Sequence, residues 1–168
     1  CLALSTSASI DEIHTTPGNA GTEHYGTNHT IAASDIAGLV NLSMQLDVDF
    51  VVVGPEAPLC AGLADQLLEV GIPCFGPQQV HAELEGSKLF AKKAMDAAGV
   101  PTADYDVLDA TSDIDAYLDA RSKEPWVIKR DVLAGGKGVV VTADRTEAVE
   151  FIQQSLETDG HVLLERFL

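Results

Sequence analysis

The first half of this sequence lacks basic residues. Residues 1–87 contain eleven acidic residues and no lysine or arginine, and all ten basic residues lie at position 88 or later. The formal net charge is −16, so we expect neither nucleic acid nor an anionic membrane as a partner. If residues 1–87 bind a phosphorylated substrate, backbone amides must hold its phosphate, or a cation must come from outside this chain.

Cysteines and long apolar runs are also scarce. The three cysteines, Cys1, Cys60 and Cys74, are odd in number and lack metal-ligand spacing, which argues against a disulfide framework and a zinc site. No apolar segment approaches the roughly 20 residues that span a bilayer, and no signal-peptide pattern opens the chain. With 46% hydrophobic and 21% charged residues, the composition is typical of a globular protein, and we expect a cytoplasmic location.

Residues 125–141 carry the clearest chemical pattern. An apolar run reaches Lys129, a second β-branched run begins at Val139, and a glycine-rich loop around Lys137 lies between them. The loop glycines are Gly135, Gly136 and Gly138. Glycines let backbone N–H groups close on phosphate oxygens, and the two lysines add positive charge there. This strand, loop and strand pattern therefore indicates a polyphosphate site.

Two other phosphate motifs do not fit this loop. A Walker A loop needs a hydroxyl residue after its lysine, whereas Gly138 follows Lys137. A dinucleotide fingerprint needs a helix after the glycines, whereas Val139 opens a strand-like run. An ordinary glycine-rich hairpin with an exposed lysine remains open on this segment alone.

The order of the apolar patterns predicts an α/β fold. Expected helices and strands alternate throughout, and Phe50–Val53, a helix from Leu59 to Val70 and Pro73–Phe75 predict a parallel strand–helix–strand unit. Ser34 and Ser87 are the expected N-caps of two further helices. The other expected strands are 12–15, 105–108, 126–128, 139–141 and 162–165, and the other expected helices are 112–120 and 147–156.

Seven segments, in this order and spacing, together resemble the phosphoribosylamine-glycine ligases of the ATP-grasp superfamily. They are Pro17–Thr22, Val53–Leu59, Phe75–Pro77, Glu85–Lys92, Gly99–Ala103, Ile128–Lys129 with Leu133–Val139, and Glu165–Leu168. The resemblance implies a parallel, Rossmann-like N-terminal domain over residues 1–86, lacking its start. It also implies the first part of an ATP-grasp domain over residues 87–168, lacking its remainder.

The resemblance also implies a reaction. ATP phosphorylates the carboxylate of glycine, and the amine of 5-phosphoribosylamine attacks the glycyl phosphate to give glycinamide ribonucleotide, ADP and phosphate, a step of purine biosynthesis. Magnesium or manganese would be required, with its ligands expected beyond Leu168 and none within this chain. No catalytic residue is implied within the chain itself.

By the same resemblance, two sets of residues would contact the substrates. The ATP contacts would be Lys88, Lys129, Ala134, Gly135, Gly136, Lys137 and Gly138, with Glu165, Arg166, Phe167 and Leu168 along adenine and ribose. The phosphoribosylamine site would be lined by Pro17, Gly18, Asn19, Gly54, Pro55, Glu56 and Pro58. Glu56 can equally be a helix N-terminal acid favoured by the helix dipole. Lys92 and Lys93 are expected to be solvated.

Two departures from the family pattern stand next to Lys129. The family usually has alanine and glycine where this chain has Arg130 and Val132, so Arg130 adds a charge and Val132 stiffens the approach to the loop. The glycine-rich phosphate loop expected before Cys1 is also absent, so the chain resembles an internal fragment. Two alternatives stay open: another ATP-grasp carboxylate-amine ligase, and a non-catalytic nucleotide-binding module.

Overall fold

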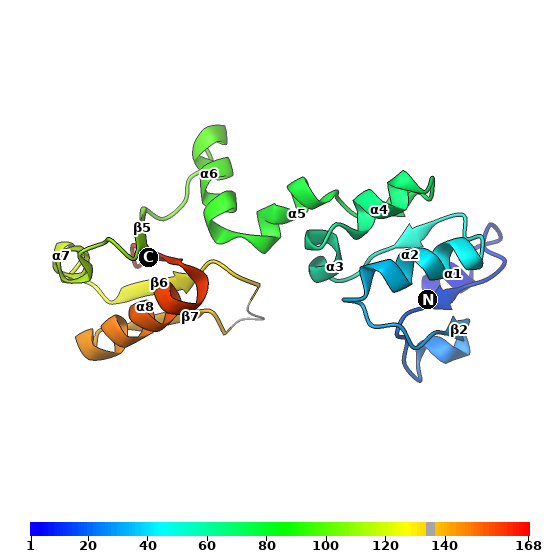
Figure 1. Cartoon of the computed structure of the whole chain (residues 1–168), viewed down its shortest axis with the longest axis horizontal. Helices are drawn as coiled ribbons and strands as arrows, with labels where there is room; N and C mark the ends of the chain where they lie inside the picture. Colours follow the sequence, from blue (N-terminus) through cyan, green and yellow to red (C-terminus); the bar gives the residue numbers. More distant parts are fainter. Residues whose placement is uncertain (134–136) are drawn as a thin grey trace. The chain divides into compact units, whose positions relative to one another are not determined.

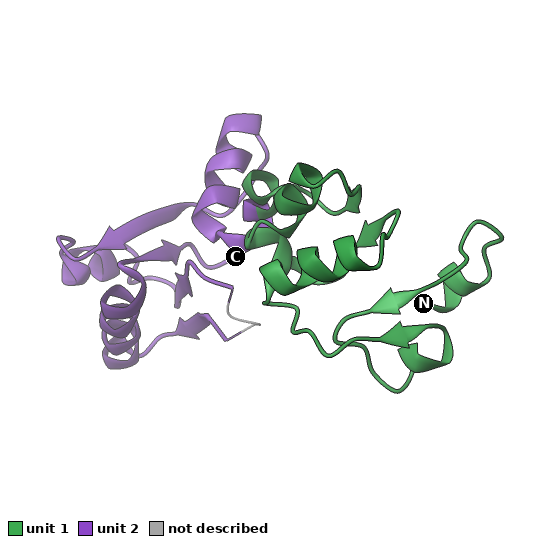
Figure 2. Cartoon of the chain, turned by 45° about the vertical axis from the view of Figure 1, so that its right-hand side comes forward, with its two compact units in different colours: residues 1–82 green, residues 83–168 purple. Residues whose placement is uncertain are grey.

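The computed structural model describes residues 1–133 and 137–168. The chain divides into two compact units, residues 1–82 and residues 83–168, which Figure 2 shows in different colours. Each unit has its own helices, strands and buried residues, so each is described by itself. No helix within the described residues combines the length and apolar character needed to cross a membrane.

Unit 1 is built from short strands and helices. Its strands pair in parallel, β1 with β2 and β3 with β4, in two separate two-stranded sheets. The elements are α1 (Leu2–Ser5), β1 (His14–Thr15), the 3-10 helix η1 (Thr22–His24), β2 (Thr27–Asn28), α2 (Ile36–Gln45), β3 (Val51–Val52), α3 (Glu56–Cys60), α4 (Leu63–Glu69), β4 (Cys74–Phe75) and α5 (Gln79–Gly86), which continues into unit 2.

The predicted parallel strand–helix–strand unit is present, with two corrections. The single helix expected from Leu59 to Val70 is two helices, because Gly62 adopts a left-handed conformation with φ of 85° between them. The N-cap of α2 is Asp35 rather than Ser34, since the Asp35 carboxylate accepts a hydrogen bond from the Gly38 N–H at 2.9 Å. A core of Val40, Leu63, Leu67 and Ile72 holds α2 and α4 together.

Unit 2 contains a four-stranded sheet in the order β5-β8-β6-β7, in which all neighbours are antiparallel (Figure 1). Helix α6 begins at the predicted cap Ser87, whose hydroxyl accepts a hydrogen bond from the Phe90 N–H, and ends at Gly99. The elements are α6 (Lys88–Ala98), β5 (Tyr105–Asp109), α7 (Ile114–Ala120), β6 (Trp126–Arg130), β7 (Val139–Thr142), α8 (Arg145–Asp159) and β8 (His161–Glu165).

The two faces of this sheet have different neighbours. Side chains alternate between the faces of a strand, and one set packs with α7 and α8 into the core of the unit. That core is Leu108, Leu118, Trp126, Ile128, Ala148, Ile152, Val162 and Leu164. The alternate set includes Lys129, Glu165, Val139 and Val141, and both of these valines are exposed. We call this side, defined by Val107, Val127, Lys129, Val139, Val141, Leu163 and Glu165, the second face.

Helix α8 depends on its first turn. The Asp144 carboxylate accepts hydrogen bonds from the Thr146 and Glu147 N–H groups, and α8 packs Ala148 and Ile152 against the sheet. Replacing Asp144 with alanine should lower the free energy of unfolding by about 1 kcal/mol, since the cap is lost. Chemical denaturation measures this, with Asp144→Asn, which keeps an acceptor, as the control. Equal stability of wild type and Asp144→Ala would contradict the assignment.

Candidate nucleotide-binding site

A buried carboxylate on β8 organises the charged part of the second face. The Glu165 side chain is 4% exposed, and its Oε2 lies 2.8 Å from the Lys129 Nζ and 3.1 Å from the Lys92 Nζ. Val127 of β6 stands opposite Glu165 in the sheet, which brings Lys129, two residues further along the same strand, to the same face. Three elements, α6, β6 and β8, therefore meet at one carboxylate.

Lys92 was expected to be solvated, and that expectation is wrong. Its side chain is 7% exposed, and its ammonium donates to the Thr102 hydroxyl at 2.8 Å and to the Ala103 carbonyl at 3.0 Å besides pairing with Glu165. The ammonium also lies 5.4 Å from the centre of the Tyr105 ring. Thr102, Ala103 and Glu165 together use all three N–H donors of the lysine, so Lys92 is fixed in place. Lys129, by contrast, is 28% exposed.

The other predicted phosphate lysine, Lys88, is the first residue of α6. Its Nζ donates to the Val132 carbonyl at 3.0 Å, at the end of β6 where the glycine-rich segment begins. Helix α6 is joined to the same place by Asp131, which accepts hydrogen bonds from the Ser87 hydroxyl and the Leu89 N–H, both at 3.0 Å. These hydrogen bonds hold the N-terminus of α6 next to the segment that follows β6.

Asp131 also contacts the start of β8. Its Oδ2 lies 2.9 Å from the His161 Nε2, and the Asp131 side chain is 6% exposed. Burial by itself would raise the pKa of this carboxyl group, but the hydrogen bonds from His161, Leu89 and Ser87 outweigh burial and lower the pKa. Asp131 is therefore a fixed negative charge that fastens α6 to β6 and β8.

The Arg130 side chain lies on the other face of the sheet from Lys129 and Glu165. It alternates with Lys129 along β6, and its guanidinium donates two hydrogen bonds to the Asp159 carboxylate, at 2.6 and 2.8 Å, at the end of α8. Arg130 also anchors the glycine-rich segment through its backbone, since its N–H donates to the Gly138 carbonyl at 2.8 Å. Of the predicted loop contacts, Ala134, Gly135 and Gly136 lie outside the described residues; Lys137 is exposed and Gly138 is buried.

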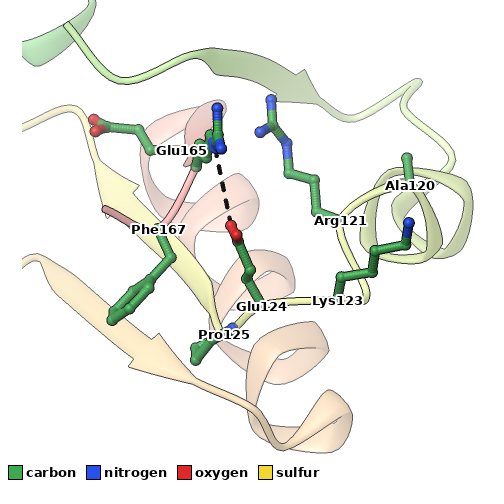
Figure 3. A pocket seen from close by; sticks show the side chains of 8 residues that line it. Ala120, Arg121, Lys123, Glu124, Pro125, Glu165 and Phe167 are labelled. Carbon is green, nitrogen blue, oxygen red and sulfur yellow. Dashed lines mark ion pairs between the residues drawn. The ribbon is translucent and has the colours of Figure 1, made fainter.

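A pocket of about 270 Å³ lies at the end of β8, and Figure 3 shows its lining. It is lined by Ala120, Arg121, Lys123, Glu124, Pro125, Glu165, Arg166 and Phe167. Glu165, Arg166 and Phe167 of the predicted ATP contacts line it, whereas Lys88 and Lys129 do not. The Arg166 Nε lies 4.0 Å from the Glu124 Oε2, and the dashed line in Figure 3 marks this ion pair. The buried Glu165 Oε1 has no hydrogen-bond partner among the described residues.

The predicted substrate loop in unit 1 is held in a defined shape. The Asn19 side chain accepts hydrogen bonds from the Gly21 and Thr22 N–H groups at 2.7 and 3.1 Å, and the Asn28 amide donates to the Asn19 carbonyl at 2.9 Å. Gly18 has a φ of 74°, and a Cβ there would collide with the Asn28 side chain. Only glycine fits this position, so the loop backbone is fixed next to β2.

The second predicted substrate loop joins β3 to α3. Gly54 and Pro55 are exposed, Glu56 is the exposed first residue of α3, and Pro58 is buried. Gly54 has open space where a Cβ would lie, so its neighbours do not require a glycine. Glu56 lies in the first turn of α3, where the helix dipole favours an acidic side chain.

Two family models together match the whole chain. Residues 1–85 match "Phosphoribosylglycinamide synthetase, N domain", and residues 86–168 match "Phosphoribosylglycinamide synthetase, ATP-grasp (A) domain". The chain belongs to the phosphoribosylglycinamide synthetase family. This confirms the resemblance found in the sequence, and the α/β fold class with it.

Named relatives of the family agree. The chain is 43% identical to a phosphoribosylamine-glycine ligase of Mycobacterium bovis over 99% of its own length, and 45% identical to one of Streptomyces coelicolor over 100%. It spans only 40% and 39% of those relatives. A solved phosphoribosylamine-glycine ligase of Thermotoga maritima matches with a TM-score of 0.73 and 29% identity, over 99% of this chain and 40% of that one.

More distant structures share the fold. The D-alanine-D-alanine ligase of Bacillus anthracis complexed with ATP is 21% identical with a TM-score of 0.64, over 82% of this chain and 46% of that one. This likeness supports the fold alone.

The sequence predicted some residues of the charged cluster around Glu165 and missed others. Lys88, Lys129 and Glu165 were named from the family motifs, and the structure brings Lys129 and Glu165 into contact. Lys92 and Asp131 were not expected to take part, and both have partners far away in the sequence. The exposure of Val139 and Val141 was not predicted either, because three consecutive valines give no alternation that separates the two faces of the strand.

The Asp131 cluster predicts a pH-dependent stability. Because its pKa in the folded protein is lower than in the unfolded chain, the carboxylate stabilises the fold above the unfolded value, about 4, and this stabilisation is lost as pH falls through the folded pKa. Asp131→Asn should therefore cost about 1–3 kcal/mol at pH 6 and progressively less below pH 4. Urea denaturation across this range measures the difference.

The exposed Asp11 provides the control, because Asp11→Asn removes a carboxylate outside the cluster. A stability difference between wild type and Asp131→Asn that stayed constant from pH 6 to pH 2.5 would contradict the prediction.

Proposed function

We propose that this chain forms part of an ATP-dependent ligase that joins glycine to 5-phosphoribosylamine. The γ-phosphoryl group of ATP passes to a glycine carboxylate oxygen, giving glycyl phosphate and ADP. The amine nitrogen of phosphoribosylamine then attacks the glycyl carbonyl carbon, the acyl C–O bond breaks, and phosphate leaves as glycinamide ribonucleotide forms. The observation that carries the proposal is the Lys129–Glu165–Lys92 cluster beside the glycine-rich segment, in a chain matched by both family models.

The family matches also support different tasks for the two domains. We place the substrate domain at residues 1–86 and the first part of the ATP-grasp domain at residues 87–168, close to the limits of the two matches. The ATP contacts would then all come from the second domain. Phosphoryl transfer depends mostly on holding the reacting groups in place and on neutralising the charge of the phosphates. Lysines with fixed positions do both.

The second face of the sheet offers the chemical groups that ATP needs. Lys129 and Lys88 would bind phosphates, and residues 134–138 would cover them. The exposed Val139 and Val141 give an apolar surface beside Lys129 for a flat base. Among the described residues no group donates a hydrogen bond to the buried Glu165 Oε1, and the amino group of adenine is a donor that would satisfy it. Arg166, Phe167 and Leu168 would continue this contact along the nucleotide.

Unit 1 would bind the other substrate. Pro17, Gly18 and Asn19 lie in the loop fixed by Asn28, and Gly54, Pro55 and Glu56 are exposed at the start of α3. Pro58 is buried and would shape this second loop from inside. Since unit 1 lacks lysine and arginine, backbone amides of these loops would contact the phosphate.

Magnesium or manganese would accompany ATP in this reaction and neutralise charge on its phosphates. The described residues contain no group of three or more metal-ligating side chains, so the metal ligands would come from elsewhere in the enzyme. The remaining partners would be small molecules, with neither nucleic acid nor a membrane expected at a net charge of −16, and the enzyme would act in the cytoplasm.

Phosphate recognition by Lys129 can be tested directly. Lys129→Met should weaken ATP binding by about 1–3 kcal/mol, or roughly 5- to 160-fold, because a charge-assisted contact is lost. Isothermal titration of ATP into the protein made from the complete reading frame measures the effect. Lys93→Met, an exposed lysine of α6, is the matched control. Equal losses in the two variants would contradict the role of Lys129.

Turnover separates the candidate functions. The complete reading frame should form ADP and glycinamide ribonucleotide from ATP, glycine and freshly made phosphoribosylamine. The 168-residue chain alone should not, since it spans only 40% and 39% of the ligases that it resembles. Product analysis by mass spectrometry measures both. ATP turnover only with a different acid or amine would favour another carboxylate-amine ligase. Binding of ATP without turnover would favour a nucleotide-binding module.

A further inference from the structure

Two lysines share one buried carboxylate, and only one of them can reach a ligand. Lys92 has three partners, and its side chain is 7% exposed, so it cannot turn towards an anion in solution. Lys129 is 28% exposed, and the ion pair recorded for it is with Glu165. Both ammonium groups lie within 3.1 Å of the same oxygen, Glu165 Oε2. The two lysines therefore have different tasks.

The charges of this cluster decide whether Lys129 can attract a phosphate. With two lysines and one glutamate the cluster carries one net positive charge. If Lys92 were neutral, Glu165 and Lys129 would form a closed pair with no net charge, and Glu165 would hold the Lys129 ammonium at 2.8 Å against the pull of an anion. Because Glu165 is buried, water screens this attraction weakly.

We infer that Lys92 is a positioning residue for ATP binding, which neutralises Glu165 so that the charge of Lys129 remains available to the phosphates. This inference rests on the proposed function. Lys92 acts through Glu165 and touches no substrate itself. Helix α6, which carries Lys88 four residues before Lys92, is held at its N-terminus by Asp131 through Ser87 and Leu89. The position of Lys88 therefore does not depend on the charge of Lys92.

The first test separates phosphate recognition from recognition of the base. ATP and inorganic tripolyphosphate are titrated into the protein from the complete reading frame at constant ionic strength. Lys92→Met, which keeps the length of the side chain without its charge, should weaken both ligands about tenfold, and adenosine should be unaffected. Lys92→Arg should stay within about threefold of wild type, and the exposed Lys93→Met within about twofold.

The second test asks whether Lys92 works through Glu165. In Lys92→Met/Glu165→Gln the carboxylate that would trap Lys129 is gone, so tripolyphosphate affinity should return to within about threefold of wild type. A purely structural role of Lys92 predicts no such recovery. Unfolding midpoints of all variants are measured in parallel. If Lys92→Met does not fold, Glu165→Gln alone tests the inference. This variant should bind tripolyphosphate more tightly than wild type, because the net positive charge of the cluster increases when the carboxylate is removed.

The outcomes distinguish this inference from the proposed function. A wild-type protein that bound no ATP would overturn both. Normal ATP binding by wild type together with equal tripolyphosphate affinity in Lys92→Met would overturn the role of Lys92 and leave the proposed function intact. Failure of the double variant to recover affinity, or weaker tripolyphosphate binding in Glu165→Gln, would also overturn it.

Discussion

The ion pairs of Glu165 are the interaction on which the second unit depends. Removing a carboxylate from water costs several kcal/mol unless cations and hydrogen bonds replace the lost hydration. Glu165 is 4% exposed, and two lysines from different elements compensate its charge. This requirement joins α6 and β6 to β8, so the arrangement that permits the buried charge also fixes the place of Lys129, the proposed phosphate ligand. Under the proposed function, stability and ligand binding depend on the same atoms. Removing one partner of the buried ion pair would destabilise the fold by more than the pair itself contributes.

The fold was predictable where local patterns are strong. The strands β6, β7 and β8 follow from short β-branched or apolar runs, and α6 follows from Ser87 at its start and Gly99 at its end, where the chain adopts a φ of 66°. The errors arose where two local solutions compete. Asp35 and Ser34 are both good caps, and the apolar spacing from Leu59 to Val70 continues across Gly62 although the backbone does not. The pairing of four strands into two separate sheets in unit 1 depends on tertiary contacts that no local pattern contains.

The site was predictable to the extent that motifs name residues, but its connections were not. Lys88, Lys129 and Glu165 belong to motif segments, whereas the contacts of Asp131 with Ser87 and Leu89 join residues more than forty positions apart. Lys92 illustrates the difficulty most clearly. It lies beside Lys93, and nothing in the sequence separates the two, yet Lys93 is exposed and Lys92 is buried by its place on the α6 face that meets β8. A buried lysine is rare and needs a partner, and the partner is 73 residues away.

The two departures from the family pattern have a simple structural account. Arg130 follows Lys129 in β6, so its side chain lies on the face covered by α8, where Asp159 binds it through two hydrogen bonds. Its charge is compensated there and does not add to the charge of the Lys92, Lys129 and Glu165 cluster. Val132 contributes its backbone carbonyl, which accepts a hydrogen bond from Lys88, and any residue at this position has that group. Both substitutions therefore change side chains that the cluster does not use, while the backbone that it uses is kept. At Arg130 the sequence can depart from the family pattern because neighbouring side chains of a strand lie on opposite faces, so the arginine and Lys129 have different surroundings.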